Sequence, residues 1–189
     1  MIASGLLERS VKQDLDKGGH VRTFIRAGRV LACLVVSMAA SLAGAEEKAA
    51  APMIIYDTAL QSGWENWSWA KTELSLEVGG SARKPIKVEA GPWQALYLHH
   101  EPVSTAGYSR LQLLIQGSAP DGQVRILALV NGKPVGDGHL LKLGNTGWTK
   151  VGTPLAELGV EDQAIDGIWV QNASAAALPK FYVTEIRLE

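Results

Sequence analysis

Short runs of β-forming residues, separated by glycine, proline, asparagine or aspartate, continue from Met53 to the end of the chain. These runs predict strands at 53–56, 67–78, 84–90, 93–100, 109–117, 123–130, 137–143, 148–152, 165–172 and 180–189. The strongest hairpin signal is Asn131-Gly132, because both residues tolerate the positive φ of a two-residue turn. Only Leu155–Leu158 indicates a helical turn. The pattern predicts an all-β fold, a two-sheet antiparallel β-sandwich of the jelly-roll type.

The beginning of the sequence has the features of an export signal. An apolar run at 30–42 has the length of a signal-peptide core and is short for a membrane span. Three arginines precede it, and Ala43-Gly44-Ala45 provides the small residues of a cleavage site. We therefore predict a signal peptide helix over 1–45, a flexible linker over 46–52 and one domain over 53–189. This predicts a secreted or periplasmic protein; the alternative is a buried apolar helix.

Cysteine usage limits how the domain can be stabilised. Cys33 is the only cysteine, and it lies inside the predicted signal peptide, where the apolar run continues past it and argues against a lipid anchor. The mature chain then has no thiol for a disulfide or a metal. No cofactor is predicted, except that a structural Ca²⁺ is compatible with the acidic composition. The candidate ligands for this Ca²⁺ are Asp57, Asp166 and Glu185.

The charge balance excludes one class of partner. Residues 46–189 carry 12 basic and 16 acidic side chains, with no cluster of lysine and arginine. Phosphate contacts need such a cluster, so the mature chain is not predicted to bind nucleic acid. It is also expected to be a monomer that does not associate with a membrane.

Alternation of side chains along the strands predicts which residues leave the core. Aliphatic residues at alternate positions mark the core side, and lysine, glutamate and aromatic residues share the other side. The predicted core-facing residues are Ala70, Thr72, Leu74, Leu76, Val78, Leu96, Leu98, Val124, Ile126, Ala128, Val130, Ile168 and Val170. The predicted outward-facing residues include Trp67, Trp69, Trp93, Tyr97, His99, Gln123, Arg125, Trp169 and Gln171.

Large aromatic residues on an outward face indicate a binding surface, since soluble monomers seldom expose such a patch without a use for it. Aromatic rings stack on the apolar faces of sugars, and nearby amide, arginine and histidine groups bind hydroxyls. The predicted carbohydrate-binding residues are Trp69, Trp93, Tyr97, His99, Arg125, Trp169 and Gln171. In the alternative interpretation, a register shift of one residue turns these rings into the core. Trp64 and Trp148 border loops and are interpreted as packing residues.

Six segments carry a resemblance over essentially all of 53–189, among them GWENWSW (63–69), GPWQALYLHH (91–100) and GIWVQN (167–172). Their order and spacing resemble secreted bacterial β-sandwich domains of the carbohydrate-binding-module type, with a galactose-binding-like jelly-roll fold. The resemblance implies binding of a polysaccharide or oligosaccharide through Trp69, Trp93, Tyr97 and Trp169. Such domains often accompany polysaccharide-degrading enzymes, whereas no catalytic domain is recognised in this sequence.

Two other functions remain open from the sequence. The same aromatic face can serve a structural or protein-interaction module of the cell surface or periplasm. A small glycan-active enzyme would instead need two carboxylates at a set separation, for which Glu65, Glu73 and Glu101 are candidates. His99 and His100 do not predict a metal site, because adjacent strand residues point to opposite faces. With no motif of a hydrolase or a nucleotide-binding enzyme, we predict a non-catalytic domain.

Overall fold

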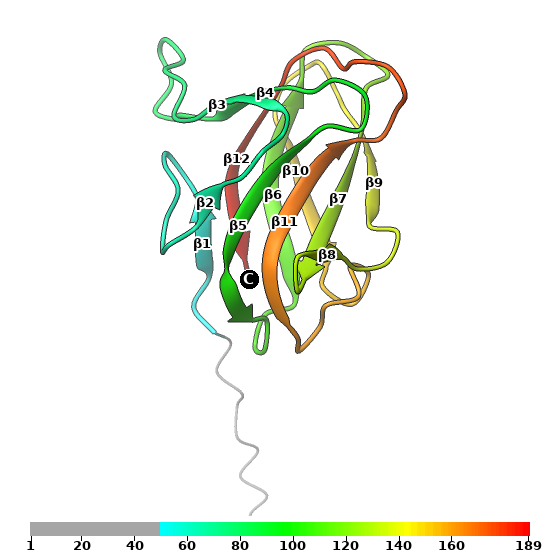
Figure 1. The fold of residues 1–189 in the computed structure, drawn as a ribbon. Coiled ribbons are helices and arrows are strands. Elements are labelled where there is room, and N and C mark those ends of the chain that lie inside the picture. Colours follow the sequence, from blue (N-terminus) through cyan, green and yellow to red (C-terminus); the bar gives the residue numbers. More distant parts are fainter. Residues whose placement is uncertain (1–49) are drawn as a thin grey trace, which may run out of the picture. The chain divides into compact units, whose positions relative to one another are not determined.

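The computed structural model describes residues 50–189 as two stacked antiparallel sheets, and thus confirms the predicted all-β sandwich (Figure 1). The predicted signal peptide over 1–45 and most of the predicted linker lie outside the described residues. Sheet A contains, in order, β10 (Thr149–Pro154), β6 (Arg110–Gly117), β12 (Phe181–Leu188), β4 (Ile86–Glu89) and β3 (Lys71–Glu73), with β1 (Met53–Tyr56) also paired to β12. Sheet B contains β2 (Glu65–Asn66), β5 (Ala95–Ser104), β11 (Ala164–Asn172), β7 (Gln123–Val130) and β8 (Lys133–Pro134), with β9 (His139–Lys142) also paired to β7.

The core consists of side chains from the inner faces of both sheets. Sheet A contributes residues such as Ile86, Leu113, Phe181 and Val183, all fully or almost fully buried. In sheet B, the strand registers predicted from alternation are confirmed, because seven of the eight residues assigned to the core side of β5, β7 and β11 are buried. They are Leu96, Leu98, Val124, Ile126, Ala128, Ile168 and Val170, and Val130 is half-buried at the margin of the core.

The predicted hairpin at Asn131-Gly132 is also confirmed. Val130 pairs with Lys133 across the turn, and the two residues between them have φ angles of 54° and 70°. Positive φ at both central positions defines the type I′ turn, whose twist matches that of the flanking strands. At Leu155–Leu158 the chain makes a turn and no helix.

The single strand predicted over 67–78 is wrong. The chain leaves sheet B after β2 and joins sheet A at β3, so residues 67–70 connect the two sheets along one edge. Ala70 is buried in the core at this crossing, and Ser75 at φ 55° ends the extended conformation. Leu76 and Val78, predicted to face the core, are therefore half-buried and exposed. Periodicity along one segment does not reveal that its hydrogen-bond partners change from one sheet to the other.

Four charged side chains form a ladder on the solvent face of β3 and β4. The Glu89 carboxylate forms ion pairs with Lys71 Nζ at 3.0 Å and with Lys87 Nζ at 2.9 Å. Lys87 Nζ also lies 3.5 Å from Glu73 Oε2. Hydrogen bonds from Lys87 and then Lys71 lower the pKa of Glu89 from 4.5 to about 2. The side chain of Glu89 therefore stays ionised in the folded protein at pH values where the unfolded chain is protonated.

This lowered pKa predicts a pH-dependent contribution to stability. The contribution is present above pH 4.5 and is lost as the pH falls toward 2, because the unfolded state then binds a proton that the folded state resists. In thermal unfolding, the Tm advantage of the wild type over Glu89→Gln should be small, since solvent screens exposed pairs, and should disappear by pH 2. Glu161→Gln, which removes an exposed carboxylate elsewhere, should show no such trend. A constant difference between wild type and Glu89→Gln from pH 5 to pH 2 would contradict the assignment.

Candidate functional site

The outward face of sheet B carries a cluster of aromatic rings at its centre. Tyr97 of β5 and Trp169 of β11 pair directly across the two strands, with ring centroids 5.9 Å apart at an interplanar angle of 80°. Both side chains alternate with core residues and are half-buried, so they lie on the side opposite the core. Tyr97 and Trp169 thus form the floor of a surface that the next elements enlarge.

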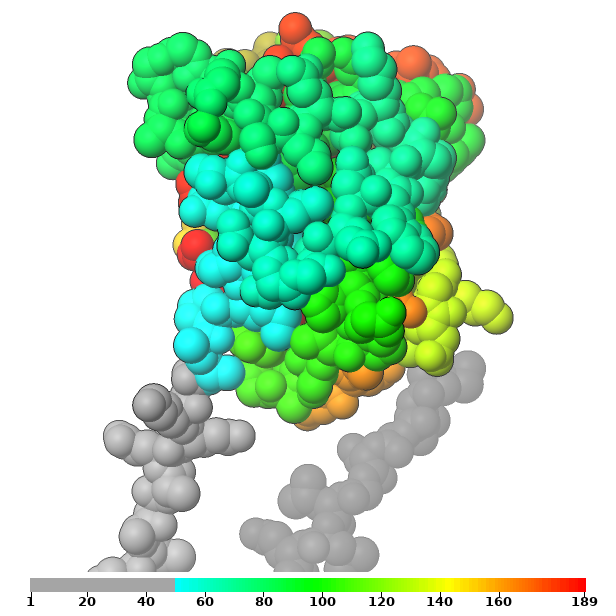
Figure 2. Space-filling view, turned by 60° about the vertical axis from the view of Figure 1, so that its left-hand side comes forward, coloured from blue at the N-terminus to red at the C-terminus, as the bar shows by residue number. Residues whose placement is uncertain are grey.

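The edge segment 65–70 adds two indoles to this floor. Its backbone follows β5, because Trp67 N–H donates to the Tyr97 carbonyl at 2.9 Å and Ala70 N–H donates to the Ala95 carbonyl at 3.1 Å. Ser68 Oγ accepts a hydrogen bond from Tyr97 N–H at 2.9 Å and itself donates to Asn66 Oδ1. These bonds fix Trp67 and its neighbours against sheet B. Figure 2 shows the side of the molecule on which the chain between β1 and β4 covers much of the surface.

Trp67 presents one open ring face to solvent. Its other face stacks on His99 with a centroid distance of 3.6 Å and an angle of 8°, and its indole N–H donates to Glu65 Oε2 at 2.8 Å. The side chain is nevertheless 53% exposed. A ring that is supported on one face and open on the other is well suited to stacking on a flat apolar ligand surface.

Trp69 connects this platform to the loop that precedes β5. Its ring packs edge-on against Trp169 with centroids 4.9 Å apart, and its N–H donates to the Trp93 carbonyl at 3.2 Å. Gln171 Nε2 donates to the same carbonyl at 3.0 Å. Trp93 itself lies before β5 at φ 59° and is 51% exposed, so its predicted place within a strand is wrong although its side chain reaches solvent.

Buried Asn172 holds the loop that carries Trp93. Its Nδ2 donates to the carbonyls of Gly91 at 2.8 Å and Ala176 at 2.7 Å, and its Oδ1 accepts from Ser174 N–H at 3.0 Å. The side chain is fully buried at the end of β11. One amide therefore connects two loops and sets the position of the backbone to which Trp69 and Gln171 are bound.

We call the group Trp67, Trp69, Tyr97, His99 and Trp169 the aromatic face. The structure thus brings together four of the seven residues predicted for the site, and Trp93 and Gln171 join them through the shared carbonyl. Arg125, the seventh, lies half-buried on β7 opposite Gln171, next to Leu140 of β9, which is 52% exposed.

Trp67 and Leu140 were not among the predicted site residues. Trp67 shares its strand parity with Trp69, and this signal was available in the sequence. Leu140 carried no signal, because its place beside Arg125 depends on how β9 pairs with β7.

Comparisons with known proteins agree on the fold. No protein family model matches the sequence. A family 29 carbohydrate binding module superimposes with a TM-score of 0.54 at 16% identity, over 74% of this chain and 92% of that one. A variant of such a module complexed with cellulohexaose gives 0.54 at 16% identity over 73% and 89%, and a variant complexed with mannohexaose gives 0.53 at 15% identity over 73% and 90%. The chain has the fold of a carbohydrate-binding module.

A sequence relative extends this comparison. An endoglucanase of Dictyostelium discoideum is 25% identical over an alignment of 142 residues that covers 70% of this chain. The matched region spans only 20% of that enzyme. The similarity therefore concerns one part of a much larger protein.

Within this module-like fold, Gly167 makes room for the floor of the aromatic face. Tyr97 lies across Gly167, and a Cβ built on this glycine would meet Tyr97 Cε2 at 2.6 Å. Burial, followed by the negative charge of Asp166, raises the pKa of the Tyr97 hydroxyl, which therefore remains a neutral hydrogen-bond donor. A glycine within a strand commonly marks such a close approach of a neighbouring group.

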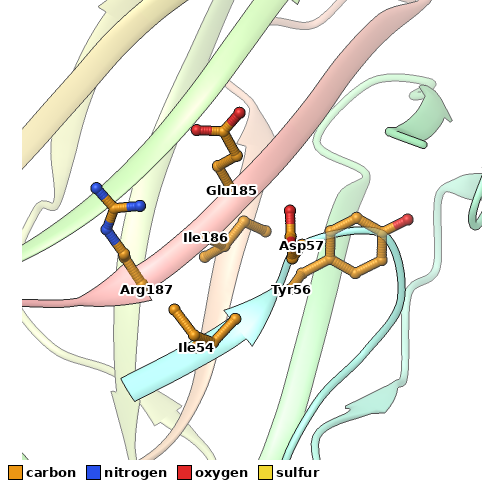
Figure 3. A pocket seen from close by; sticks show the side chains of 6 residues that line it. All are labelled: Ile54, Tyr56, Asp57, Glu185, Ile186 and Arg187. Atoms are coloured by element: carbon orange, nitrogen blue, oxygen red, sulfur yellow. The ribbon is translucent and has the colours of Figure 1, made fainter. Parts of the chain in front are cut away.

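The three candidate Ca²⁺ ligands do not converge. Asp57 and Glu185 line the same pocket beside β1 and β12 of sheet A, and Figure 3 shows them there together with Arg187. Asp166 belongs to sheet B, where its Oδ2 accepts a hydrogen bond from Gly132 N–H at 2.6 Å. No group of three or more acidic or histidine side chains in residues 50–189 is arranged to hold a metal ion. The same residues contain no helix that could span a membrane.

Of the three acids considered for catalysis, Glu65 and Glu101 lie on neighbouring strands of sheet B, and Glu73 lies on sheet A. Glu65 is bound to the indole of Trp67 beside the aromatic face, whereas Glu73 lies in sheet A near Lys87, so its predicted place near the platform is wrong. The cause is again the change of sheet between β2 and β3. Glu101 is exposed on β5.

The two remaining aromatic predictions have different outcomes. Trp64 is 4% exposed in the core and packs on His100, with ring centroids 5.1 Å apart, as expected for a packing residue. Trp148 is not part of the core; it is half-buried and lines a groove on sheet A.

The contact between Tyr97 and Gly167 predicts a sensitive position. Gly167→Ala should displace the Tyr97 ring and lower the free energy of unfolding by about 1–3 kcal/mol, as overpacking does elsewhere. Chemical denaturation monitored by tryptophan fluorescence measures this loss. Gly79→Ala is the matched control, because its Cβ would have no neighbour within 4 Å. Equal stability of Gly167→Ala and Gly79→Ala would contradict the inference that the Tyr97 ring needs the space left by a glycine at position 167.

Proposed function

We propose that residues 50–189 form a non-catalytic carbohydrate-binding module that holds a polysaccharide or oligosaccharide on the aromatic face. The observation that supports this most directly is the exposure of Trp67, Trp69 and Trp93 at 53%, 42% and 51% in a folded domain with a complete core elsewhere. The fold supports it further, since solved structures of the same architecture include modules complexed with cellulohexaose and with mannohexaose.

The chemistry of the face suits a neutral sugar chain. The open ring face of Trp67 offers a stacking surface for the C–H bonds of a pyranose, and Trp69 and Trp93 extend it toward the next units. Tyr97, Gln171 and Arg125 lie beside these rings and supply hydroxyl, amide and guanidinium groups for sugar hydroxyls. Because the indoles of Trp67 and Trp69 are already hydrogen-bonded within the protein, the rings are held in place before the ligand arrives.

A ring substitution tests this assignment. Replacing both Trp67 and Trp69 by alanine should weaken binding to glucan or mannan oligosaccharides at least tenfold, equivalent to about 1.4 kcal/mol, because the stacking surface is lost. Isothermal titration with cellohexaose and mannohexaose measures the effect at the aromatic face. Ile54→Ala, an exposed apolar residue of β1, is the control and should bind like the wild type.

The outcomes separate the candidate functions. Release of reducing sugar during the titration would indicate a glycan-active enzyme. A wild type that binds no glycan from a wide panel of soluble and insoluble polysaccharides would contradict carbohydrate binding, and would favour a protein partner for the same face. Unchanged glycan affinity in the double variant would show that the glycan binds somewhere other than the aromatic face.

We further propose that the module is exported and acts as a monomer outside the cytoplasm. The apolar run at 30–42, the arginines before it and Ala43-Gly44-Ala45 after it support cleavage behind Ala45. N-terminal sequencing of the mature protein should therefore read Glu46-Glu47-Lys48. A mature protein that still carries the apolar run would contradict this proposal.

A further inference from the structure

A second groove lies on the outward side of sheet A, on the opposite face of the sandwich from the aromatic face. The connection between β3 and β4, which projects from the sandwich in Figure 1, forms one wall of it. Strands β6 and β12 and the residue before β10 form the remainder. The groove is open to solvent and has a volume of about 490 Å³, within the range of about 300–1,000 Å³ that is common for small-molecule sites.

The floor of this groove is a row of three polar or aromatic side chains. Tyr182 of β12 pairs with Gln116 of β6, and Trp148 directly precedes Thr149, which pairs with Ile115. The register therefore places Gln116 in the middle of the row, with Trp148 on one side of it and Tyr182 on the other. All three side chains are half-buried, line the groove and lie outside the core. At the usual strand spacing, the two rings lie about 10 Å apart, so they would meet different units of an extended ligand.

The wall of the groove is anchored to the sandwich. The buried Tyr56 hydroxyl accepts from Ser75 N–H at 2.9 Å and donates to the Lys84 carbonyl at 2.7 Å, at the two ends of the projecting loop. Leu76 N–H donates to the Pro85 carbonyl at 3.0 Å and closes the base of the loop. The groove is thus formed in the protein without a ligand.

The charged side chains around the groove lie in ion pairs, which favours a neutral ligand. Arg83 Nε binds Glu185 Oε1 at 2.8 Å, and Lys84 Nζ lies 2.6 Å from Glu77 Oε1. By contrast, the Gln116 amide, the Tyr182 hydroxyl and the Trp148 indole N–H have no hydrogen-bond partner within residues 50–189. A ligand that fits these groups is uncharged, carries many hydroxyls and has apolar faces for two rings.

We propose that this groove is a second binding site for a short segment of a neutral glycan, with Trp148 and Tyr182 as its stacking residues and Gln116 as its hydrogen-bonding residue. The site is separate from the aromatic face and does not depend on it. Since the two sites lie on opposite sheets, one domain can hold two sugar chains at once and so connect them.

Stoichiometry tests the proposal. Native mass spectrometry and isothermal titration of the purified protein with cellohexaose and with mannohexaose should show two bound molecules per chain. Trp148→Ala should lose one of them and keep the site on the aromatic face, whereas Trp67→Ala with Trp69→Ala should keep the groove. Tyr182→Phe, which retains the ring and removes only the hydroxyl, should weaken the groove site about three- to tenfold, as expected for one hydrogen bond.

The results distinguish the two proposals. One bound molecule that Trp148→Ala leaves unchanged overturns the groove and preserves the aromatic face. One bound molecule that only Trp148→Ala removes supports the groove and overturns the aromatic face, and absence of any binding overturns both. Ile54→Ala is the control for surface substitution, and thermal unfolding of each variant verifies that it is folded. Binding of peptides in place of glycans at Trp148 would also overturn the proposal.

Discussion

Every strand of the sandwich has two faces, and burial of one face against the opposite sheet determines what the other face displays. In β5 and β11 the core buries Leu96, Leu98, Ile168 and Val170. The residues that alternate with them, Tyr97, His99 and Trp169, must therefore lie outward. The aromatic face is thus a consequence of how the core is made. This explains why large rings lie at the surface of a domain that already has a filled core, in which aliphatic side chains predominate.

The edge segment 65–70 completes this face and links the two sheets. Its backbone bonds to β5 place Trp67 over His99, while Ala70 enters the core and the chain continues into sheet A. The same few residues therefore serve the fold and the surface. Ser68 stabilises the crossing by bonding to Asn66 and to the backbone of Tyr97, and the two indoles beside it remain partly exposed to solvent.

Polar groups beneath the rings give the surface its rigidity. The Trp93 carbonyl accepts hydrogen bonds from both Trp69 and Gln171, and the buried amide of Asn172 fixes the loop that supplies this carbonyl. On the opposite sheet, the Tyr56 hydroxyl has a similar function for the loop that forms the wall of the groove. In both places a buried polar side chain, fully engaged with backbone groups, holds an exposed surface in one conformation.

Much of the fold was predictable from local sequence, and the reason is physical. Alternation along a strand and the preference for positive φ at Asn131-Gly132 depend only on neighbouring residues, so the all-β class, the hairpin and the inward sides of β5, β7 and β11 followed from the sequence. The signal peptide was likewise predicted from the order of its own residues, and this prediction lies outside the described residues. The crossing at 67–70, the stack of Trp67 on His99, and the gathering of Trp148, Gln116 and Tyr182 were decided only by the tertiary structure. Each of these depends on pairing between segments that are distant in the sequence, and a one-dimensional pattern does not encode which strands become neighbours.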